Sequence, residues 1–131
     1  MFQDRELDVV IVRLGDDPGI EPLRVQRAPL VVGLGECRSA NIVQHPDGED
    51  KRLAIRNNLI YRVDEGTHQL HYAADTRQGS SGAPVLDDEL RVIGVHVGAV
   101  EVASGGQSYN LGVPITSVVA RLGALAAEIP E

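Results

Sequence analysis

A serine enclosed by glycines is the part of this sequence whose residue types and spacing are best suited to chemistry. The segment 75–84 reads DTRQGSSGAP, with Ser81 shortly after Gly79 and directly before Gly82. Glycine adopts positive φ angles at little cost, so this spacing permits a tight turn in which backbone N–H groups converge. A hydroxyl beside converging N–H groups can act as a nucleophile next to an oxyanion hole, as acyl transfer requires. Taken alone, G-x-S-G more often marks an ordinary turn between two strands.

The composition is that of an ordinary globular domain. The chain has 131 residues, of which 43% are hydrophobic and 24% charged, so it can form one domain with a real core. Aromatic residues are scarce, and the core is therefore expected to consist of Val, Leu, Ile and Ala. The net charge of −7 argues against nucleic acid and anionic membranes as primary partners.

The cysteine count and the chain start bear on location and on metal binding. The single cysteine, Cys37, permits no internal disulfide and no thiolate metal cluster, and is expected to be a small apolar residue at the start of a strand. The first residues are polar and no apolar run reaches membrane-spanning length, so a cytoplasmic location is expected. The acidic segments 47–50 and 87–89 are expected to be solvated turns, and no metal or cofactor is expected.

Short β-type runs separated by turn residues must position the serine loop. Their spacing of ~8–12 residues is typical of an antiparallel β-barrel or sandwich. Strands are expected at 7–14, 30–35, 39–44, 52–63, 69–74, 84–86, 90–97 and 109–113. A helix is expected over 116–127, with Thr116 or Ser117 as its N-cap and with Val118, Val119, Leu122 and Leu125 on its packed face. The sequence therefore predicts an all-β fold that ends in one helix.

Three segments resemble the trypsin-like (chymotrypsin-fold) serine peptidases, in particular the bacterial glutamyl-endopeptidase-like branch. They are NIVQHPDG at 41–48 with Lys51 after it, YAADTRQGSSGAPV at 72–85, and VIGVHVG at 92–98. A fourth segment, LDVVIVRL at 7–14, resembles the piece that carries the family's catalytic acid. The resemblance implies a trypsin-like antiparallel β-barrel in three parts: the end of a first barrel and a connector (1–29), the second barrel with the serine loop (30–115), and a helix with a tail (116–131).

The resemblance also assigns catalytic roles. It implies that Ser81 is the nucleophile, that Asp8 orients the catalytic imidazole, and that the N–H groups of Gly79 and Ser81 form the oxyanion hole. Apart from the resemblance, a lone aspartate such as Asp8 caps a turn or faces solvent. Ser80 stands where vertebrate trypsin-like enzymes have an aspartate that pairs with a freshly cut N-terminal amine, so activation by that ion pair is not expected.

A substrate pocket follows from the same resemblance. In the family, residues at the positions of Thr76 and His96 face the side chain that precedes the scissile bond, and Gly98 belongs to the strand that lines the pocket. A hydroxyl and an imidazole N–H can donate to one oxygen, so cleavage after Glu or Gln is the implied preference. The alternative for His96 is a half-buried strand histidine satisfied by a backbone carbonyl.

The resemblance leaves the catalytic base unaccounted for. The four histidines, His45, His68, His71 and His96, all follow Asp8, whereas the family's catalytic histidine precedes the acid. A serine without a base is a weak nucleophile at neutral pH, so the chain alone is expected to be inactive. We expect an N-terminal barrel, from the same gene or from a separate chain, to supply the histidine to an endopeptidase that acts on proteins or peptides.

Two other functions fit the same residues. One is a non-catalytic pseudopeptidase domain in a larger signalling or defence protein, which would bind an extended peptide by strand addition along 97–99. The other is a purely structural β domain. The enzyme is the leading interpretation, because Asp8 and the whole serine loop are intact.

Overall fold

The structure is a computed structural model of the 131-residue chain. It describes every residue except 34–35, 37, 57, 103–107 and 130–131. Cys37, the end of the expected strand 30–35 and the last two residues of the expected tail therefore lie outside the described residues.

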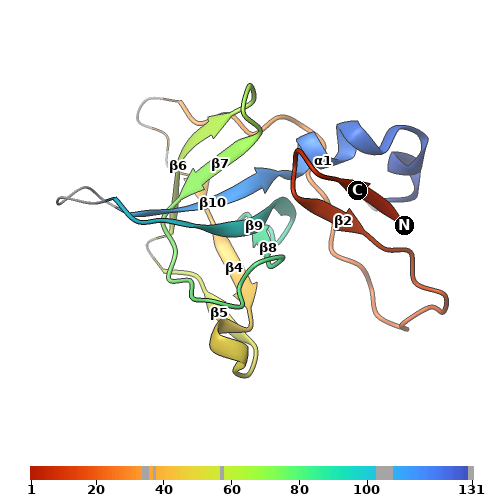
Figure 1. Ribbon diagram of the computed structural model, residues 1–131, viewed down its shortest axis with the longest axis horizontal. Coiled ribbons are helices and arrows are strands. Elements are labelled where there is room, and N and C mark those ends of the chain that lie inside the picture. The colour runs from red at the N-terminus through yellow and green to blue at the C-terminus, as the bar shows by residue number, and fades with distance from the viewer. Residues whose placement is uncertain (34–35, 37, 57, 103–107, 130–131) are drawn as a thin grey trace.

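Antiparallel β-structure dominates the described part of the chain (Figure 1). Phe2–Asp4 (β1) and Val9–Ile11 (β2) form a separate hairpin. The other strands share one sheet in the order β3-β6-β7-β10-β9-β8-β4-β5. They are Arg38–Ser39 (β3), Asn41–Gln44 (β4), Arg52–Ala54 (β5), Leu59–Asp64 (β6), Gln69–Tyr72 (β7), Pro84–Leu86 (β8), Val92–Val100 (β9) and Tyr109–Pro114 (β10). The predicted all-β class is confirmed.

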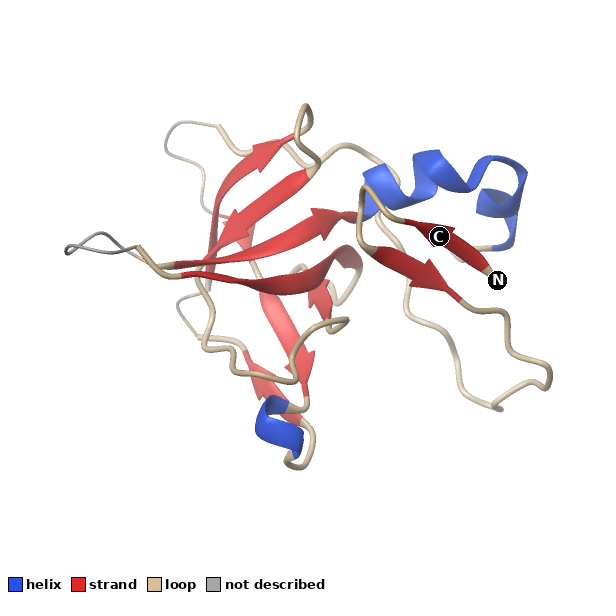
Figure 2. Cartoon of the chain, in the orientation of Figure 1, coloured by secondary structure: helices blue, strands red, loops and turns tan. Residues whose placement is uncertain are grey.

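Helical structure lies mainly at the C-terminal end (Figure 2). The α-helix Ile115–Leu122 (α1) continues directly from β10 and is followed by the 3-10 helix Gly123–Glu128 (η2). A second 3-10 turn, Pro46–Gly48 (η1), connects β4 to β5. No helix in the described part of the chain is long and apolar enough to cross a membrane.

The helix begins and ends differently from the expectation. Pro114 is the N-cap, with φ −56°, and no side chain caps the helix, so the expected capping by Thr116 or Ser117 is wrong. The proline side chain has no acceptor for the N–H groups of the first turn, so α1 begins without a side-chain cap. Val118 and Leu122 are buried as predicted, but Leu125 lies in η2 with 44% of its surface exposed.

Buried apolar side chains form two clusters. The first fills the eight-stranded sheet and contains Leu30, Ala40, Ile42, Ile60, Leu70, Tyr72, Ala83, Val85 and Ile93. The second joins the β1–β2 hairpin to α1 and β10, and contains Leu7, Val9, Val113, Ile115 and Val118. Each buried aliphatic side chain contributes about 1.5–3 kcal/mol relative to an exposed one. The hairpin is therefore held to the sheet by an apolar cluster of its own, as its position beside α1 in Figure 1 illustrates.

The N-terminal strand is shorter than the expected 7–14 because a turn precedes it. Leu7 is buried with 3% of its surface exposed, and Asp8 adopts φ 54°, a left-handed conformation that a strand residue cannot have. The strand consequently begins at Val9 and pairs with β1, which was not expected because FQD is a short and polar sequence.

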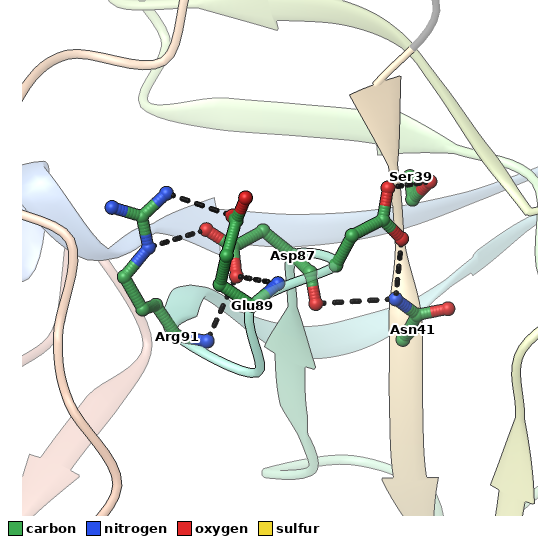
Figure 3. A network of polar contacts seen from close by, with 6 residues as sticks. Ser39, Asn41, Asp87, Glu89 and Arg91 are labelled. Carbon is green, nitrogen blue, oxygen red and sulfur yellow. Dashed lines mark hydrogen bonds and ion pairs between the residues drawn. The ribbon is translucent and has the colours of Figure 1, made fainter.

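The acidic turn 87–89 is solvated and is also held by ion pairs and hydrogen bonds (Figure 3). The Asp87 carboxylate accepts from the backbone N–H of Arg91 at 2.8 Å and from Arg91 Nε at 2.8 Å. Asn41 Nδ2 donates to the Asp87 carbonyl and to Asp88 Oδ1, each at 3.2 Å. Asp88 and Glu89 are exposed, as expected for a solvated turn, and the Asn41 contacts also tie the β8–β9 hairpin to β4.

Candidate active site

The loop between β7 and β8 carries Ser81 at the surface of the molecule. Gly79 and Gly82 adopt φ 91° and 84°, so both glycines use the conformational freedom that the sequence suggested. The Ser81 Oγ donates to the carbonyl of Val97 on β9 at 2.9 Å. The same strand also holds the loop through its backbone, because Gly82 N–H donates to the His96 carbonyl at 2.8 Å.

Ser80 has an internal role in this loop. Only 1% of its surface is exposed, and its Oγ accepts from the backbone N–H of Arg77 at 3.3 Å. Its backbone carbonyl accepts from Ala83 N–H at 3.0 Å. The loop is thus closed by neutral hydrogen bonds at the position where vertebrate trypsin-like enzymes have the aspartate that pairs with an N-terminal amine.

The backbone N–H groups of Gly79 and Ser81 are free to bind an external acceptor. Among the residues that the structure describes, neither group has a hydrogen-bond partner. Ser81 is exposed, so both N–H groups can donate to water until a ligand oxygen takes its place. This arrangement can accommodate an oxyanion next to the serine hydroxyl.

Asp8 and Ser81 line the same cavity, although they lie far apart in the sequence. The cavity has a volume of about 360 Å³ and is bounded by β2, β9, α1 and the serine loop. His96 also lines it. Asp8 is exposed and lies in the turn before β2, with a φ of 54°. An acid and a hydroxyl thus flank one space that is large enough for an additional side chain.

His96 is buried and engaged by a tyrosine. Its Nδ1 lies 2.5 Å from the hydroxyl of Tyr72, and the two rings meet edge to face with centroids 6.1 Å apart. Burial lowers the pKa of His96, and burial raises the pKa of the Tyr72 hydroxyl well above its ordinary value. Both side chains are therefore uncharged at neutral pH, and the partner of His96 is a side chain rather than the backbone carbonyl that the alternative expectation named.

The remaining histidines contact groups other than the serine hydroxyl. Their contacts are His45 Nδ1 with the Glu49 carbonyl at 3.0 Å, His68 Nδ1 with Ser117 Oγ at 3.0 Å, and His71 Nε2 with Gln69 Oε1 at 3.1 Å. Ser81 donates instead to a carbonyl oxygen, which does not remove a proton as an imidazole does.

Thr76 lies on a different cavity from His96. Its Oγ1 donates to Asn110 Oδ1 at 2.5 Å, and Asn110 Nδ2 donates to the Ala74 carbonyl at 2.8 Å. Both residues line a cavity of about 450 Å³, together with Tyr109 and Ala99. The structure thus brings Asp8, Ser81 and His96 to one cavity and places Thr76 on a second one.

Gly98 lies on β9 opposite Leu111 of β10. A Cβ built on Gly98 would meet no atom within 4 Å, so the space beside it is open. β8 pairs with β9 only up to Val95, whereas β10 pairs with it as far as Val100. Within the described residues, the edge of β9 on the β8 side is consequently without a partner strand from Val97 onward.

Two side chains that contact the candidate site residues were not identified from the sequence: Asn110 bonds to Thr76, and Tyr72 bonds to His96. Asn110 is a buried polar residue within a strand, and Tyr72 is the largest fully buried side chain. A buried asparagine needs hydrogen-bond partners for its amide, so an asparagine within an apolar strand could have been identified from the sequence as a candidate site residue. The pairing of Tyr72 with His96 joins non-adjacent strands and gives no local signal in the sequence.

Comparisons with known proteins agree with this architecture. A family model described as a trypsin-like peptidase domain matches residues 1–95. The chain is 40% identical over 62 residues to the uncharacterized protein y4fB of Sinorhizobium fredii, an alignment that covers 44% of this chain and 9% of that protein.

Among solved structures, the chain is similar to Rv3671c from M. tuberculosis, determined as a serine-to-alanine mutant in an inactive form. The TM-score is 0.54 at 20% identity, and the match covers 86% of this chain and 57% of that one. At this identity the likeness concerns the fold, which is therefore the trypsin-like β-barrel. Because the family model spans most of its length, the chain belongs to the family of trypsin-like peptidase domains.

Proposed function

We propose that the chain is the part of a serine endopeptidase that carries the nucleophile and the orienting acid, and that it cuts after Glu or Gln. The observation that carries the proposal is the shared cavity of Asp8 and Ser81, since an acid and a hydroxyl on either side of one space leave room for an imidazole between them. The exposed position of Ser81 gives a substrate access to its hydroxyl.

The proposed reaction follows from the groups around that cavity. An imidazole in the cavity takes the proton of Ser81 Oγ while this oxygen forms a bond to the scissile carbonyl carbon. The carbonyl oxygen becomes an oxyanion that accepts from the N–H groups of Gly79 and Ser81. The imidazole then protonates the departing amine, and water hydrolyses the acyl-enzyme by the reverse proton transfers. Asp8 keeps the imidazole in one tautomer and stabilises its charged form.

The base is proposed to come from outside these 131 residues. Each of the four histidines has another contact, and the buried His96 has its Nδ1 bound to Tyr72. A partner barrel that docks against the β1–β2 hairpin would bring an imidazole to the Asp8 side of the cavity. The hairpin offers an apolar surface for it, because Val10 and Val12 expose 55% and 63% of their surfaces.

The proposed preference for Glu or Gln rests on the neutral His96 at the cavity that Ser81 also lines. When the Tyr72 hydroxyl donates to His96 Nδ1, the second ring nitrogen carries the proton and can donate to a side-chain carbonyl or carboxylate oxygen of the substrate. Thr76 and Asn110 lie on the other cavity, where Thr76 donates to Asn110 and Asn110 donates to the Ala74 carbonyl. Gly98 leaves space beside β9 for the substrate side chain.

Peptide hydrolysis by the full natural polypeptide, with any chain that co-purifies, tests the proposal. A panel of peptides that differ only in the residue before the scissile bond should be cut after Glu or Gln, and Ser81→Ala should abolish cleavage. Cleavage that persists in Ser81→Ala would overturn the assignment of the nucleophile. Cleavage with equal rates after apolar residues would overturn the proposed specificity.

A second function is supported by the open edge of β9. The backbone from Val97 to Val100 can pair with an extended peptide whether or not hydrolysis follows. A non-catalytic domain would bind such a peptide and leave it intact, and the binding would be unchanged in Ser81→Ala.

A further inference from the structure

The 3-10 turn η1 contacts the serine loop at the peptide unit that precedes Gly79. The backbone N–H of Asp47 donates to the carbonyl of Gln78 at 2.7 Å. The turn also packs on Gly79 itself, since a Cβ at that position would lie 3.0 Å from the His45 carbonyl oxygen. Contact between the two loops is therefore made by backbone atoms at close range.

The turn is built so that the Asp47 N–H faces the serine loop. Asp47 adopts φ 56°, and Gly48 adopts φ 73°. Gly48 N–H donates to the His45 carbonyl at 3.3 Å, and Glu49 N–H donates to the Pro46 carbonyl at 2.9 Å. These bonds close the turn around a left-handed aspartate, and aspartate, like asparagine, adopts this conformation more readily than most residues other than glycine.

The hydrogen bond to Gln78 determines the direction of the next N–H group. A trans peptide is planar, and its C=O and N–H point in opposite directions. When the Gln78 carbonyl points at Asp47, the Gly79 N–H of the same peptide unit must point away from the turn. Rotation of this peptide unit would exchange the two groups and present a carbonyl oxygen where an oxyanion donor is needed, which is repulsive rather than stabilising.

We propose that the backbone N–H of Asp47 is a positioning group that holds the Gln78–Gly79 peptide in the orientation required for oxyanion binding. This inference rests on the proposed peptidase function for its catalytic consequence, but not for its structural content. The side chain of Asp47 has a minor part, because its ion pair with Arg77 at 3.3 Å is exposed to solvent.

Two matched substitutions at Asp47 distinguish the role of its backbone N–H from the role of its side-chain carboxylate. Asp47→Asn removes the charge and tolerates the left-handed conformation, so the turn and its N–H should remain in place. Asp47→Val removes the same charge, but its β-branched side chain disfavours positive φ, so the turn should rearrange and withdraw the N–H. Thermal unfolding of both variants establishes that the fold persists.

The structural step is tested without any activity, by residual dipolar couplings of backbone N–H vectors in the isotopically labelled 131-residue chain. We expect the Gly79 coupling to fit the described orientation in the wild type and in Asp47→Asn, and to deviate in Asp47→Val while couplings of β7 and β9 stay unchanged. An unchanged Gly79 coupling in Asp47→Val would overturn the proposal.

The catalytic step is tested by steady-state kinetics of the full natural polypeptide. We expect Asp47→Val to lower kcat by about 10- to 100-fold with KM within about threefold, as loss of one oxyanion donor does. Asp47→Asn should stay within about threefold of the wild type. A reoriented Gly79 peptide with unaltered kcat would overturn the catalytic role. A wild type that hydrolyses nothing would refute the proposed function, and the dipolar couplings would still decide whether Asp47 positions this peptide.

Discussion

At the scale of single residues, the Tyr72–His96 pair determines the chemistry of the buried side of the site. The pair lies between β7 and β9, with His96 exposing 3% of its surface and Tyr72 none. Because burial disfavours the charged imidazole, the pKa of His96 lies below its ordinary value. A protonated His96 would be a buried cation beside a neutral phenol, so acid should destabilise the folded chain at this position.

The lowered pKa of His96 determines how the stability of the fold depends on pH. The unfolded chain binds a proton at His96 at a higher pH than the folded chain does, so this contribution to stability is complete above the ordinary histidine pKa and is lost as the pH falls below it. The pKa of His71 is also lowered by burial and acts with the same sign. We expect the free energy of unfolding to fall between pH 7 and pH 5 by at most about 1.4 kcal/mol per pH unit for each proton.

The contribution of His96 is isolated by comparison with His96→Gln, which can still bond to the Tyr72 hydroxyl. Urea unfolding at pH 7 and at pH 5 should give a smaller difference between the two pH values for the variant than for the wild type. Equal differences for both proteins would contradict the assignment of this pH dependence to His96.

The specificity role of His96 makes a separate prediction in an active form of the protein. Since a pocket donor acts only on substrates that have a matching acceptor, His96→Ala should slow cleavage after Glu or Gln by about 10- to 100-fold. Acylation by a small ester without that side chain should change far less. Parallel losses on the two substrates, measured as kcat/KM, would indicate that His96 is only structural.

Some of these residue contacts could be predicted from the sequence and others could not. The tight loop around Ser81 could be predicted from its glycines, because glycine readily adopts positive φ angles. The approach of Asp8 to the cavity of Ser81 depends on how the β1–β2 hairpin packs on α1, which is a tertiary property. The Asn110 bond to Thr76 likewise joins a strand to a loop that is distant in the sequence.

At the scale of elements, the central strands β9 and β10 carry the pocket residues and depend on two glycines. A Cβ on Gly94 would lie 2.9 Å from the Val113 carbonyl oxygen and 3.0 Å from Leu70 Cδ2. A Cβ on Gly112 would lie 2.8 Å from the Val95 carbonyl oxygen, next to a register shift between Leu111 and Gly112. Glycine is required at both positions because the neighbouring strand approaches too closely for a side chain.

A pair of substitutions in β9 tests this requirement. Gly94→Ala should lower the free energy of unfolding by about 1–3 kcal/mol, since the backbone must shift to admit the methyl group. Gly98→Ala is the matched control on the same strand, because its Cβ would meet no atom within 4 Å. Urea unfolding that gave the two variants equal stability would contradict the close packing of β9 on β10.

Strand prediction succeeded where the sequence signal was local. The bounds of β8 agree with the expected 84–86, because Pro84 and the acidic turn 87–89 delimit a short apolar run. The expected strand at 52–63 is instead two strands, β5 and β6, which end at Ala54 and begin at Leu59. The partner of β2 could not be predicted, because β1 owes its existence to pairing with β2 and not to its own residues.

At the scale of the whole molecule, the β1–β2 hairpin and α1 leave an apolar surface exposed. Val12 and Leu14 each expose 63% of their surfaces. Beside them lies a cavity of about 440 Å³, lined in part by Ile11, Leu122 and Leu125. Apolar surfaces of this kind promote association, and in the proposed enzyme the surface would be covered by the barrel that supplies the base.

The 131-residue chain alone should therefore self-associate. Sedimentation equilibrium should show dimers or larger species at micromolar concentrations, and the double variant Val12→Lys with Leu14→Lys should shift the chain toward the monomer. Both positions are exposed, so the urea midpoint of the double variant should stay close to that of the wild type. A wild-type chain that remains monomeric throughout would contradict the proposal that this face is an interface.

The central claim is that Ser81 is a nucleophile activated by a base from outside these residues, and a fluorophosphonate tests it most directly. The full natural polypeptide and the 131-residue chain are each treated with the reagent, and the adduct on Ser81 is quantified by mass spectrometry with Ser81→Ala as the control. We expect a stoichiometric adduct on Ser81 in the full polypeptide with its co-purifying partners, and little or none in the isolated chain. The absence of an adduct from both would contradict the account, and so would equal labelling of the two.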